Sequence, residues 1–189
     1  LTDLELASFP CAYGTAENLL TRANVVQGEV VLVTGASGGV GSAVVQLARL
    51  RGARVMAVTT HEKSHDVLAL GAQQTVERSA NLVHALGRDS VDVVVDVVGG
   101  DAFTGLLDVL ERGGRYAVAG AIAGPVVPLD LRTLYLKDLT LLGCTVTTPA
   151  VFARLVGLIQ QGALRPVVRA VYPLADIALA QSDFLGKSQ

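Results

Sequence analysis

Short, uninterrupted apolar runs recur along the chain and alternate with segments of helical periodicity. Residues 30–33 and 93–95 are continuously apolar, which is typical of strands buried on both faces. Between these runs, Val40, Val44 and Leu47 recur at helical spacing. Strands that alternate with helices of this length predict βαβ units and a parallel sheet, because a parallel pair needs a crossover connection.

The same alternation continues to the end of the chain. We expect an α/β fold, a Rossmann-type doubly wound parallel sheet of about six strands with helices on both faces. A capping box at Thr2 and Glu5 predicts a first short helix, and residues 13–23 predict a second. Strands are predicted near residues 30–33, 54–58, 75–76, 91–97, 116–119 and 139–142. Later helices are predicted at 82–86, 102–110, 131–136, 151–160 and 175–184, with an extended stretch at 167–171.

The bulk composition limits the possible partners. The chain has 189 residues, the size of one domain, and 51% of them are hydrophobic, which requires a large buried core. No apolar run approaches the roughly 18 residues of a membrane span. A formal net charge of -2 without a basic cluster argues against nucleic acid as a partner. Two cysteines and an N-terminus unlike a signal peptide favour a reduced, cytoplasmic protein.

A glycine-rich turn follows the first apolar run directly. Residues 34–41 read Thr-Gly-Ala-Ser-Gly-Gly-Val-Gly, and a helix is predicted to begin inside them. Gly38 and Gly41 match the second and third glycines of the dinucleotide fingerprint, while Ala36 stands where the first is usual. Gly38 would let a phosphate approach the backbone, and the free N–H groups of the helix start would bind a diphosphate. The alternative is a tight turn that needs glycine only for its backbone.

The end of the second predicted strand bears on the choice of cofactor. NAD-binding domains usually carry an acid there, which bonds the ribose hydroxyls. This strand ends at Thr59 and Thr60, and no carboxylate follows before Glu62. A carboxylate would repel a 2′-phosphate, so its absence favours NADP(H), and Lys63 supplies an attractive charge. The alternative for Lys63 is a solvated position on the first turn of a helix.

Two other families with glycine-rich first turns fit the residues less well. Short-chain dehydrogenases place their catalytic Tyr four residues before a Lys, and that spacing is absent at every tyrosine of this chain: Tyr13, Tyr116, Tyr135 and Tyr172. Methyltransferases normally carry an acid at the end of the second strand, where Thr59 stands.

Three segments resemble the medium-chain dehydrogenase/reductase superfamily, especially its quinone oxidoreductase-like and alcohol dehydrogenase-like members. Residues 28–41 are similar to that family's fingerprint almost letter for letter, and residues 68–72 and 13–16 resemble two further family segments. The resemblance covers essentially the whole chain. It implies that residues 1–189 form the dinucleotide-binding domain and that the family's separate, mostly β catalytic domain is absent from this chain.

The resemblance also implies an activity. The chain would be the NADPH-binding domain of an oxidoreductase that transfers hydride between NADPH and a small carbonyl, quinone or activated alkene. Without a second domain to enclose the nicotinamide, we expect the chain to bind NADPH but to transfer hydride slowly or not at all. A non-catalytic NADP(H)-binding sensor or scaffold is the alternative. No catalytic residue is assigned: Tyr13 could donate a proton if it faces the nicotinamide, and packing is its other possible role.

The expected cofactor site runs along the carboxyl ends of the strands, where open α/β sheets bind ligands. The resemblance implies that the glycine turn holds the adenosine and pyrophosphate, that Lys63 lies near the 2′-phosphate, and that residues 97–99 border a ribose. Thr15, together with residues 120, 121 and 145, would lie at the nicotinamide end. The predicted cofactor-binding residues are Thr15, Ser37, Gly38, Gly39, Val40, Gly41, Thr59, Lys63, Val97, Val98, Gly99, Gly120, Ala121 and Thr145.

One cysteine stands at a family metal position. Cys11 matches the place where zinc-dependent members carry a catalytic ligand. A catalytic zinc needs three protein ligands, so we predict no metal site, and a small buried cysteine is the alternative for Cys11. Cys144 is interpreted as packing or as part of the cofactor pocket wall.

The last predicted strand suggests how copies of the chain associate. The run that begins at Leu139 and ends at Leu142 should form the edge of the sheet, and an apolar edge of that kind must be paired or covered. Family members commonly join these edges into one continuous sheet. We therefore expect a homodimer formed through this edge strand.

Overall fold

The computed structural model describes residues 1–186. These residues form a six-stranded sheet in which every neighbouring pair is parallel, in the order β3-β2-β1-β4-β5-β6. This order confirms the predicted Rossmann-type doubly wound sheet. The strands are β1 (Val30–Val33), β2 (Arg54–Thr59), β3 (Gln74–Glu77), β4 (Val91–Asp96), β5 (Leu110–Val118) and β6 (Thr140–Gly143).

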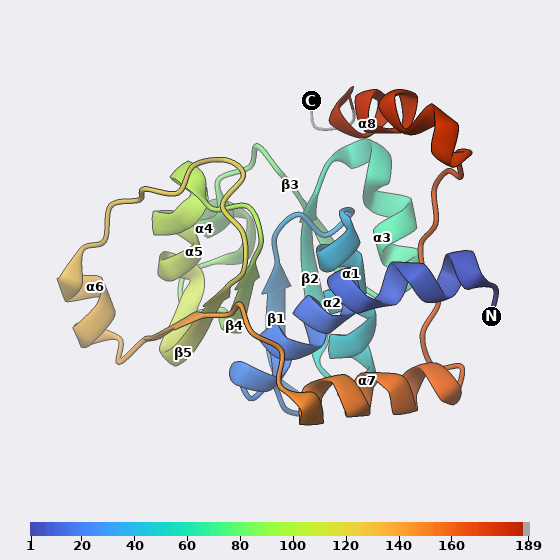
Figure 1. Ribbon diagram of the computed structural model, residues 1–189. Coiled ribbons are helices and arrows are strands. Elements are labelled where there is room, and N and C mark those ends of the chain that lie inside the picture. Colours follow the sequence, from blue (N-terminus) through green and yellow to red (C-terminus); the bar gives the residue numbers. More distant parts are fainter. Residues whose placement is uncertain (187–189) are drawn as a thin grey trace.

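Helices cover both faces of the sheet, as predicted (Figure 1). One buried cluster joins the sheet to α1, α2, α3 and α7, and a second joins it to α4, α5 and α6. The helices are α1 (Asp3–Arg22), α2 (Gly39–Leu50), α3 (Ser64–Leu70), α4 (Leu82–Leu86), α5 (Phe103–Val109), α6 (Leu131–Leu136), α7 (Pro149–Gln160) and α8 (Ile177–Gly186).

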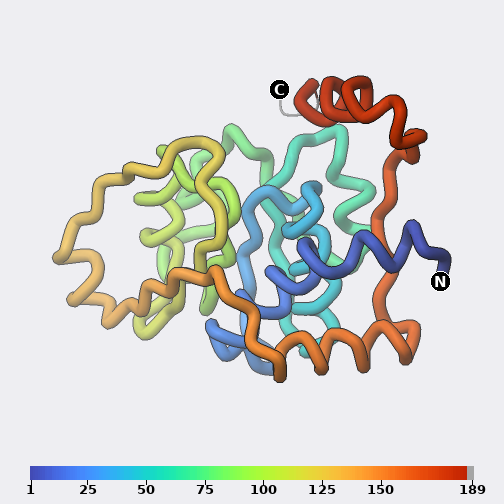
Figure 2. Tube along the Cα trace, in the orientation of Figure 1, coloured from blue at the N-terminus to red at the C-terminus, as the bar shows by residue number. Residues whose placement is uncertain are grey.

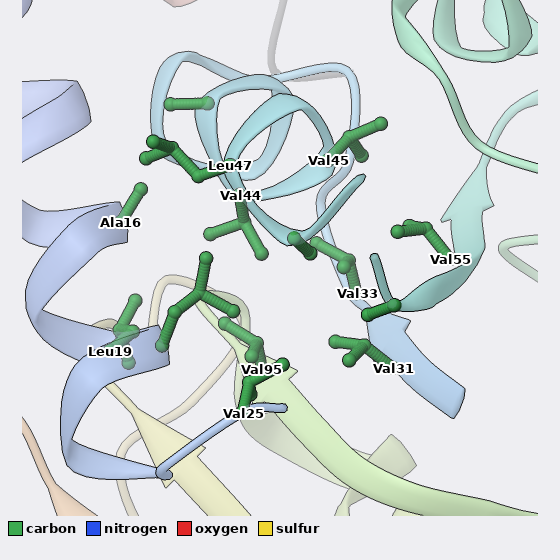
Figure 3. Packing of buried hydrophobic residues seen from close by; sticks show 14 of the residues in the cluster. Ala16, Leu19, Val25, Val31, Val33, Val44, Val45, Leu47, Val55 and Val95 are labelled. Atoms are coloured by element: carbon green, nitrogen blue, oxygen red, sulfur yellow. The ribbon is translucent and has the colours of Figure 1, made fainter. Parts of the chain in front are cut away.

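Burial on two sides accounts for the continuous apolar run of β1. Successive side chains of a strand point to opposite faces, so Val31 and Val33 enter the cluster with α1 and α2, and Leu32 enters the other cluster. All three are fully buried. Figure 3 shows Val31 and Val33 in the same packed cluster as Val44 of α2 and Leu19 of α1. The central strand is therefore packed between two helical layers, and the glycine turn follows directly at its carboxyl end.

The N-terminal segment differs from the prediction of two helices. The capping box at Thr2 and Glu5 is present, but α1 continues without a break to Arg22, with Pro10 inside it. Proline usually breaks a helix because it removes one backbone hydrogen bond and crowds the preceding turn. Here Phe9 and Tyr13, on either side of Pro10, are both buried. Packing against the core offsets the local cost, so the prediction of a break was wrong.

The fifth strand also starts earlier than predicted. Leu110 pairs with Val91 ahead of a register shift, and the regular pairing of Arg115 with Val93 follows that shift. Gly113, with φ +78°, lies between these two stretches. Gly113 therefore marks an irregularity inside the strand rather than a turn that precedes it.

The chain ends in a tail that follows α7. Figure 2 traces it from α7 to α8 through residues 163–173, which have neither helix nor strand. The 3-10 turn Leu174–Asp176 then leads into α8, close to the predicted helix at 175–184. Within residues 1–186, every helix is too short or too polar to span a bilayer.

Candidate dinucleotide-binding site

The turn between β1 and α2 presents a helix start without a side-chain cap. Gly38 is the N-cap residue of α2 and has no side chain to bond the first-turn N–H groups. Its own N–H donates to the Gly35 carbonyl at 2.9 Å, and Gly35 has φ +57°. The first N–H groups of a helix have no partner within the helix, and the positive end of the helix dipole favours an anion there. The turn is thus suited to a phosphate group.

Close packing explains why this turn requires glycine at Gly41. A Cβ atom built there would lie 2.2 Å from the Gly35 oxygen and 2.7 Å from the Ala36 Cα. At Gly38 the nearest atom to such a Cβ is again the Gly35 oxygen, at 3.3 Å. Gly41 therefore lets the first turn of α2 pack directly against the backbone of Gly35 and Ala36.

A cleft of about 1130 Å³ follows the carboxyl ends of β1 to β5. It brings together most of the predicted cofactor-binding residues. Ala121 lies instead on an adjoining pocket of about 250 Å³, which Gly99 and Gly120 share with the cleft. Thr15 is half-buried in α1 and Thr145 is exposed after β6, and neither contributes to the cleft or to that pocket. The predicted residues that line the cleft are Ser37, Gly38, Gly39, Val40, Gly41, Thr59, Lys63, Val97, Val98, Gly99 and Gly120.

At the end of β2, two buried hydroxyl groups have no hydrogen-bond partner among residues 1–186. They are the Oγ1 atoms of Thr59 and Thr60, and both residues line the cleft. A buried polar atom left unpaired costs about 1–3 kcal/mol, so most such atoms in proteins have a partner. Lys63 and Arg78 line the same cleft. This end of the cleft therefore offers two hydroxyls and two cations to a ligand.

Arg78 was missed by the sequence reasoning. It follows β3 directly, and β3 pairs with β2 in the sheet. In a Rossmann-type sheet the third strand lies beside the second, so the predicted fold would have placed residues after the third strand near the end of the second. The prediction for this end of the site used only the end of the second strand and the residues just after it.

A buried carboxylate joins the carboxyl ends of three neighbouring strands. Asp96, at the end of β4, is fully buried and accepts hydrogen bonds from the hydroxyls of Thr34 and Tyr116, both at 2.5 Å. It also accepts from the backbone N–H groups of Val98 at 2.8 Å and Gly99 at 3.1 Å. Burial raises the pKa of Tyr116, and its hydrogen bond to Asp96 raises it further. Asp96 thereby fixes the loop that borders the cleft, a network that no local sequence pattern indicates.

Tyr13 has a packing role rather than a position at the reaction centre. It is 2% exposed, and its hydroxyl donates to the Arg165 carbonyl at 2.7 Å. The same hydroxyl accepts a hydrogen bond from Gln46 at 2.9 Å. Burial raises the pKa of Tyr13. Of the two roles considered for it, the structure supports packing.

The two cysteines differ in their surroundings. Cys11 is exposed on α1, so the interpretation of it as a small buried cysteine was wrong. Cys144 is buried in the cluster with α1 and α2 and does not line the cleft, so of its two interpretations the structure supports packing. Burial raises the pKa of the Cys144 thiol. Among residues 1–186, no group of three His, Cys, Asp or Glu side chains is arranged to hold a metal ion.

Most of the chain matches a known protein family in sequence. The family model for zinc-binding dehydrogenases matches residues 39–161. The chain belongs to this family. The acryloyl-coenzyme A reductase of Metallosphaera sedula is 37% identical over 170 residues, which cover 89% of this chain and 51% of that protein. The quinone oxidoreductase of Sus scrofa is 33% identical over 179 residues, which cover 88% of this chain and 54% of that protein.

Solved structures of the same superfamily share the fold. A putative alcohol dehydrogenase from Sinorhizobium meliloti 1021 has a TM-score of 0.94 and 52% identity, covering 99% of this chain and 53% of that one. The quinone oxidoreductase of Thermus thermophilus, whose structures include a complex with NADPH, has a TM-score of 0.82 and 34% identity, covering 98% of this chain and 63% of that one. The predicted membership of the medium-chain dehydrogenase/reductase superfamily is confirmed. The chain spans about half the length of the curated relatives it matches.

Proposed function

We propose that the chain binds NADP(H) and is the cofactor-binding part of an oxidoreductase that transfers hydride between NADPH and a carbonyl, quinone or activated alkene. The observation that carries this proposal is the pair of unpartnered hydroxyls of Thr59 and Thr60 beside Lys63 and Arg78, in the same cleft as the uncapped start of α2. Hydroxyls and cations suit a 2′-phosphate, and the helix start suits the diphosphate.

The order of groups along the cleft fits one dinucleotide. The 2′-phosphate and its ribose would lie at the ends of β2 and β3, and the diphosphate at the turn between β1 and α2. The nicotinamide half would then extend toward the ends of β4 and β5, at Val97, Val98, Gly99 and Gly120. A Cβ built on Gly120 would lie 2.7 Å from the Val97 carbonyl oxygen, so these two strand ends approach each other closely.

The chain contributes position and electrostatics to this reaction. The bound nicotinamide would supply or accept the hydride. The Asp96 carboxylate accepts hydrogen bonds from the N–H groups of Val98 and Gly99, and these bonds keep the loop after β4 in one conformation. Val40, Val98 and Ala119 give the cleft apolar surface against which the rings of the cofactor can pack. A reacting group held in a fixed position is the contribution that a cofactor-binding domain makes to hydride transfer.

Calorimetric titration with NADPH and NADH tests the proposal. We expect the chain to prefer NADPH, because only that cofactor carries the 2′-phosphate. Lys63→Ala and Arg78→Ala should each weaken NADPH binding about tenfold and leave NADH binding nearly unchanged, since one charge-assisted hydrogen bond contributes about 1.5–3 kcal/mol. Arg112→Ala is the control, because Arg112 is an exposed side chain paired with Asp138 outside the cleft. Equal affinities of the unmodified chain for the two cofactors would contradict the 2′-phosphate assignment.

We also propose a homodimer formed through β6, which is the edge strand of the sheet. Leu141 lies in this strand and is 37% exposed. A lysine at the centre of an edge strand opposes pairing with a second copy. Leu141→Lys should therefore halve the mass measured by sedimentation, whereas Leu50→Lys, at an exposed position on α2, should not. A mass that stays the same in Leu141→Lys argues against edge pairing.

The cytoplasmic location predicted from the sequence remains part of this proposal. Both Cys11 and Cys144 are free thiols. Free thiols persist in reducing compartments, whereas secreted domains more often pair them.

A further inference from the structure

The tail after α7 is anchored to the helix that carries the glycine turn. Gln46 of α2 accepts a hydrogen bond from the Arg165 N–H at 3.0 Å and donates one to the Arg165 carbonyl at 3.0 Å. Tyr13 donates to the same carbonyl at 2.7 Å. Gln46 and Tyr13 are 8% and 2% exposed, so these bonds are shielded from water. We call this group of Gln46, Tyr13 and the Arg165 backbone the clasp.

Beyond the clasp, the tail supplies side chains to the cleft. Val167, Arg169 and Phe184 all line it, although they follow the sheet and its helices in the sequence. Tyr172 donates a hydrogen bond to Asp183 at 2.5 Å, which ties α8 to the tail. In Figure 1 this tail is the orange to red segment that connects α7 with α8. The cleft therefore has one wall that the Rossmann sheet does not provide.

Among the described residues 1–186, three cations line the cleft, and Arg169 is the one of these that comes from the tail. Within residues 1–186, Lys63, Arg78 and Arg169 form no ion pair with a carboxylate. Within the same range, three carboxylates also line the cleft, and two of them have other partners. Asp96 accepts hydrogen bonds from its own donors, and Asp108 pairs with Arg88 at 3.0 Å. The third carboxylate is that of Asp101. The tail thus brings an available positive charge to a cleft in which a dinucleotide would carry several negative ones.

We propose that Arg169 binds a phosphate group of the dinucleotide and that Gln46 is a positioning residue that keeps the tail in place for this contact. The inference rests on the proposed function. Gln46 lies seven residues after Gly39, the first residue of α2, which is two helical turns. One rigid helix then carries the phosphate-binding turn at its start and the clasp further along. The position of the tail arginine is set relative to the diphosphate site through that helix.

Titration of charge variants with NADPH and NADH tests the contact. Arg169→Ala should weaken binding about tenfold, which is the effect of removing one charge-assisted hydrogen bond, and Arg169→Lys should restore most of it. A loss with NADPH alone assigns Arg169 to the 2′-phosphate, and an equal loss with both cofactors assigns it to the diphosphate. Arg165→Ala is the matched control, because its exposed side chain does not line the cleft and the clasp uses only its backbone. Unchanged affinity in Arg169→Ala, or an equal loss in Arg165→Ala, overturns the inference.

A double-mutant cycle tests the clasp. Gln46→Leu removes both hydrogen bonds to Arg165 and should weaken NADPH binding by about the same factor as Arg169→Ala. The double variant should then lose little more than either single one, because both changes remove the same contact. If the loss of affinity in the double variant equalled the product of the two single losses, Gln46 would act on binding by a route other than Arg169. That result would overturn the positioning role of Gln46. If the chain binds NADPH and Arg169→Ala leaves that affinity unchanged, only this inference is disproved. If the chain binds neither cofactor, the proposed function is disproved as well.

Discussion

Gly41→Ala should strongly weaken dinucleotide binding and destabilise the fold. The added Cβ would lie 2.2 Å from the Gly35 oxygen and 2.7 Å from backbone carbon atoms of the same turn. Backbone atoms cannot move aside as a flexible side chain does, so the first turn of α2 must shift. Overpacking of this kind costs about 1–3 kcal/mol, and the shift displaces the N–H groups proposed to bind the diphosphate. We expect urea denaturation to report the lower free energy of unfolding and calorimetry to report a loss of affinity of roughly a hundredfold or more.

A second glycine of the chain provides the matched control. Gly157 lies inside α7, and a Cβ built there meets nothing within 4 Å. Alanine at an unobstructed helix position stabilises a protein by about 0.5–1 kcal/mol relative to glycine. Gly157→Ala should therefore raise the free energy of unfolding and leave NADPH binding intact. Equal behaviour of the two variants would show that the turn tolerates a side chain at Gly41.

Asp96→Ala should produce the largest loss of stability among the buried polar residues of the cleft. It leaves the hydroxyls of Thr34 and Tyr116 and the N–H groups of Val98 and Gly99 without their acceptor. Each unsatisfied buried donor costs about 1–3 kcal/mol, and water entering the space from the cleft will satisfy some of them. We expect the free energy of unfolding, measured in urea, to fall by roughly 3–5 kcal/mol.

The tyrosine partner gives the control for Asp96. Tyr116→Phe removes one donor and keeps the ring, which packs edge-on against Phe103 with a centroid distance of 5.3 Å. The remaining donors still satisfy Asp96, so this change should cost only about 1 kcal/mol. If Asp96→Ala proved no more costly than Tyr116→Phe, the carboxylate would not be the centre of the network.

Most of the architecture follows from the apolar pattern. Strands buried on both faces need continuous apolar runs, and residues 30–33 and 93–95 show them, so β1 and β4 were predicted at their observed places. The glycine turn was predicted because its chemistry depends on neighbours in the sequence. The continuation of α1 across Pro10 was not predicted, because it is favoured by the burial of Phe9 and Tyr13, and that burial depends on tertiary packing.

The parts of the site that the sequence did not reveal depend on contacts between distant residues. Thr34 and Asp96 are 62 positions apart, and Gln46 and Arg165 are 119 apart. Nothing local marks Asp96 as a buried acceptor, because an aspartate after an apolar run also suits an exposed turn. Arg169 likewise stands in a stretch without helix or strand, and only the folded position of the tail brings it to the cleft.

The strand order divides the sheet into two consecutive halves that meet at β1 and β4. Strands β1 to β3 come from residues before 78, strands β4 to β6 from residues after 90, and the pairing of β1 with β4 joins them. Contacts between residues so far apart close a long loop and form slowly compared with local ones. The hydrogen bond from Thr34 to Asp96 lies across this seam. A dinucleotide that touches both halves can bind only after they dock, so the ligand itself would favour the joined state during folding.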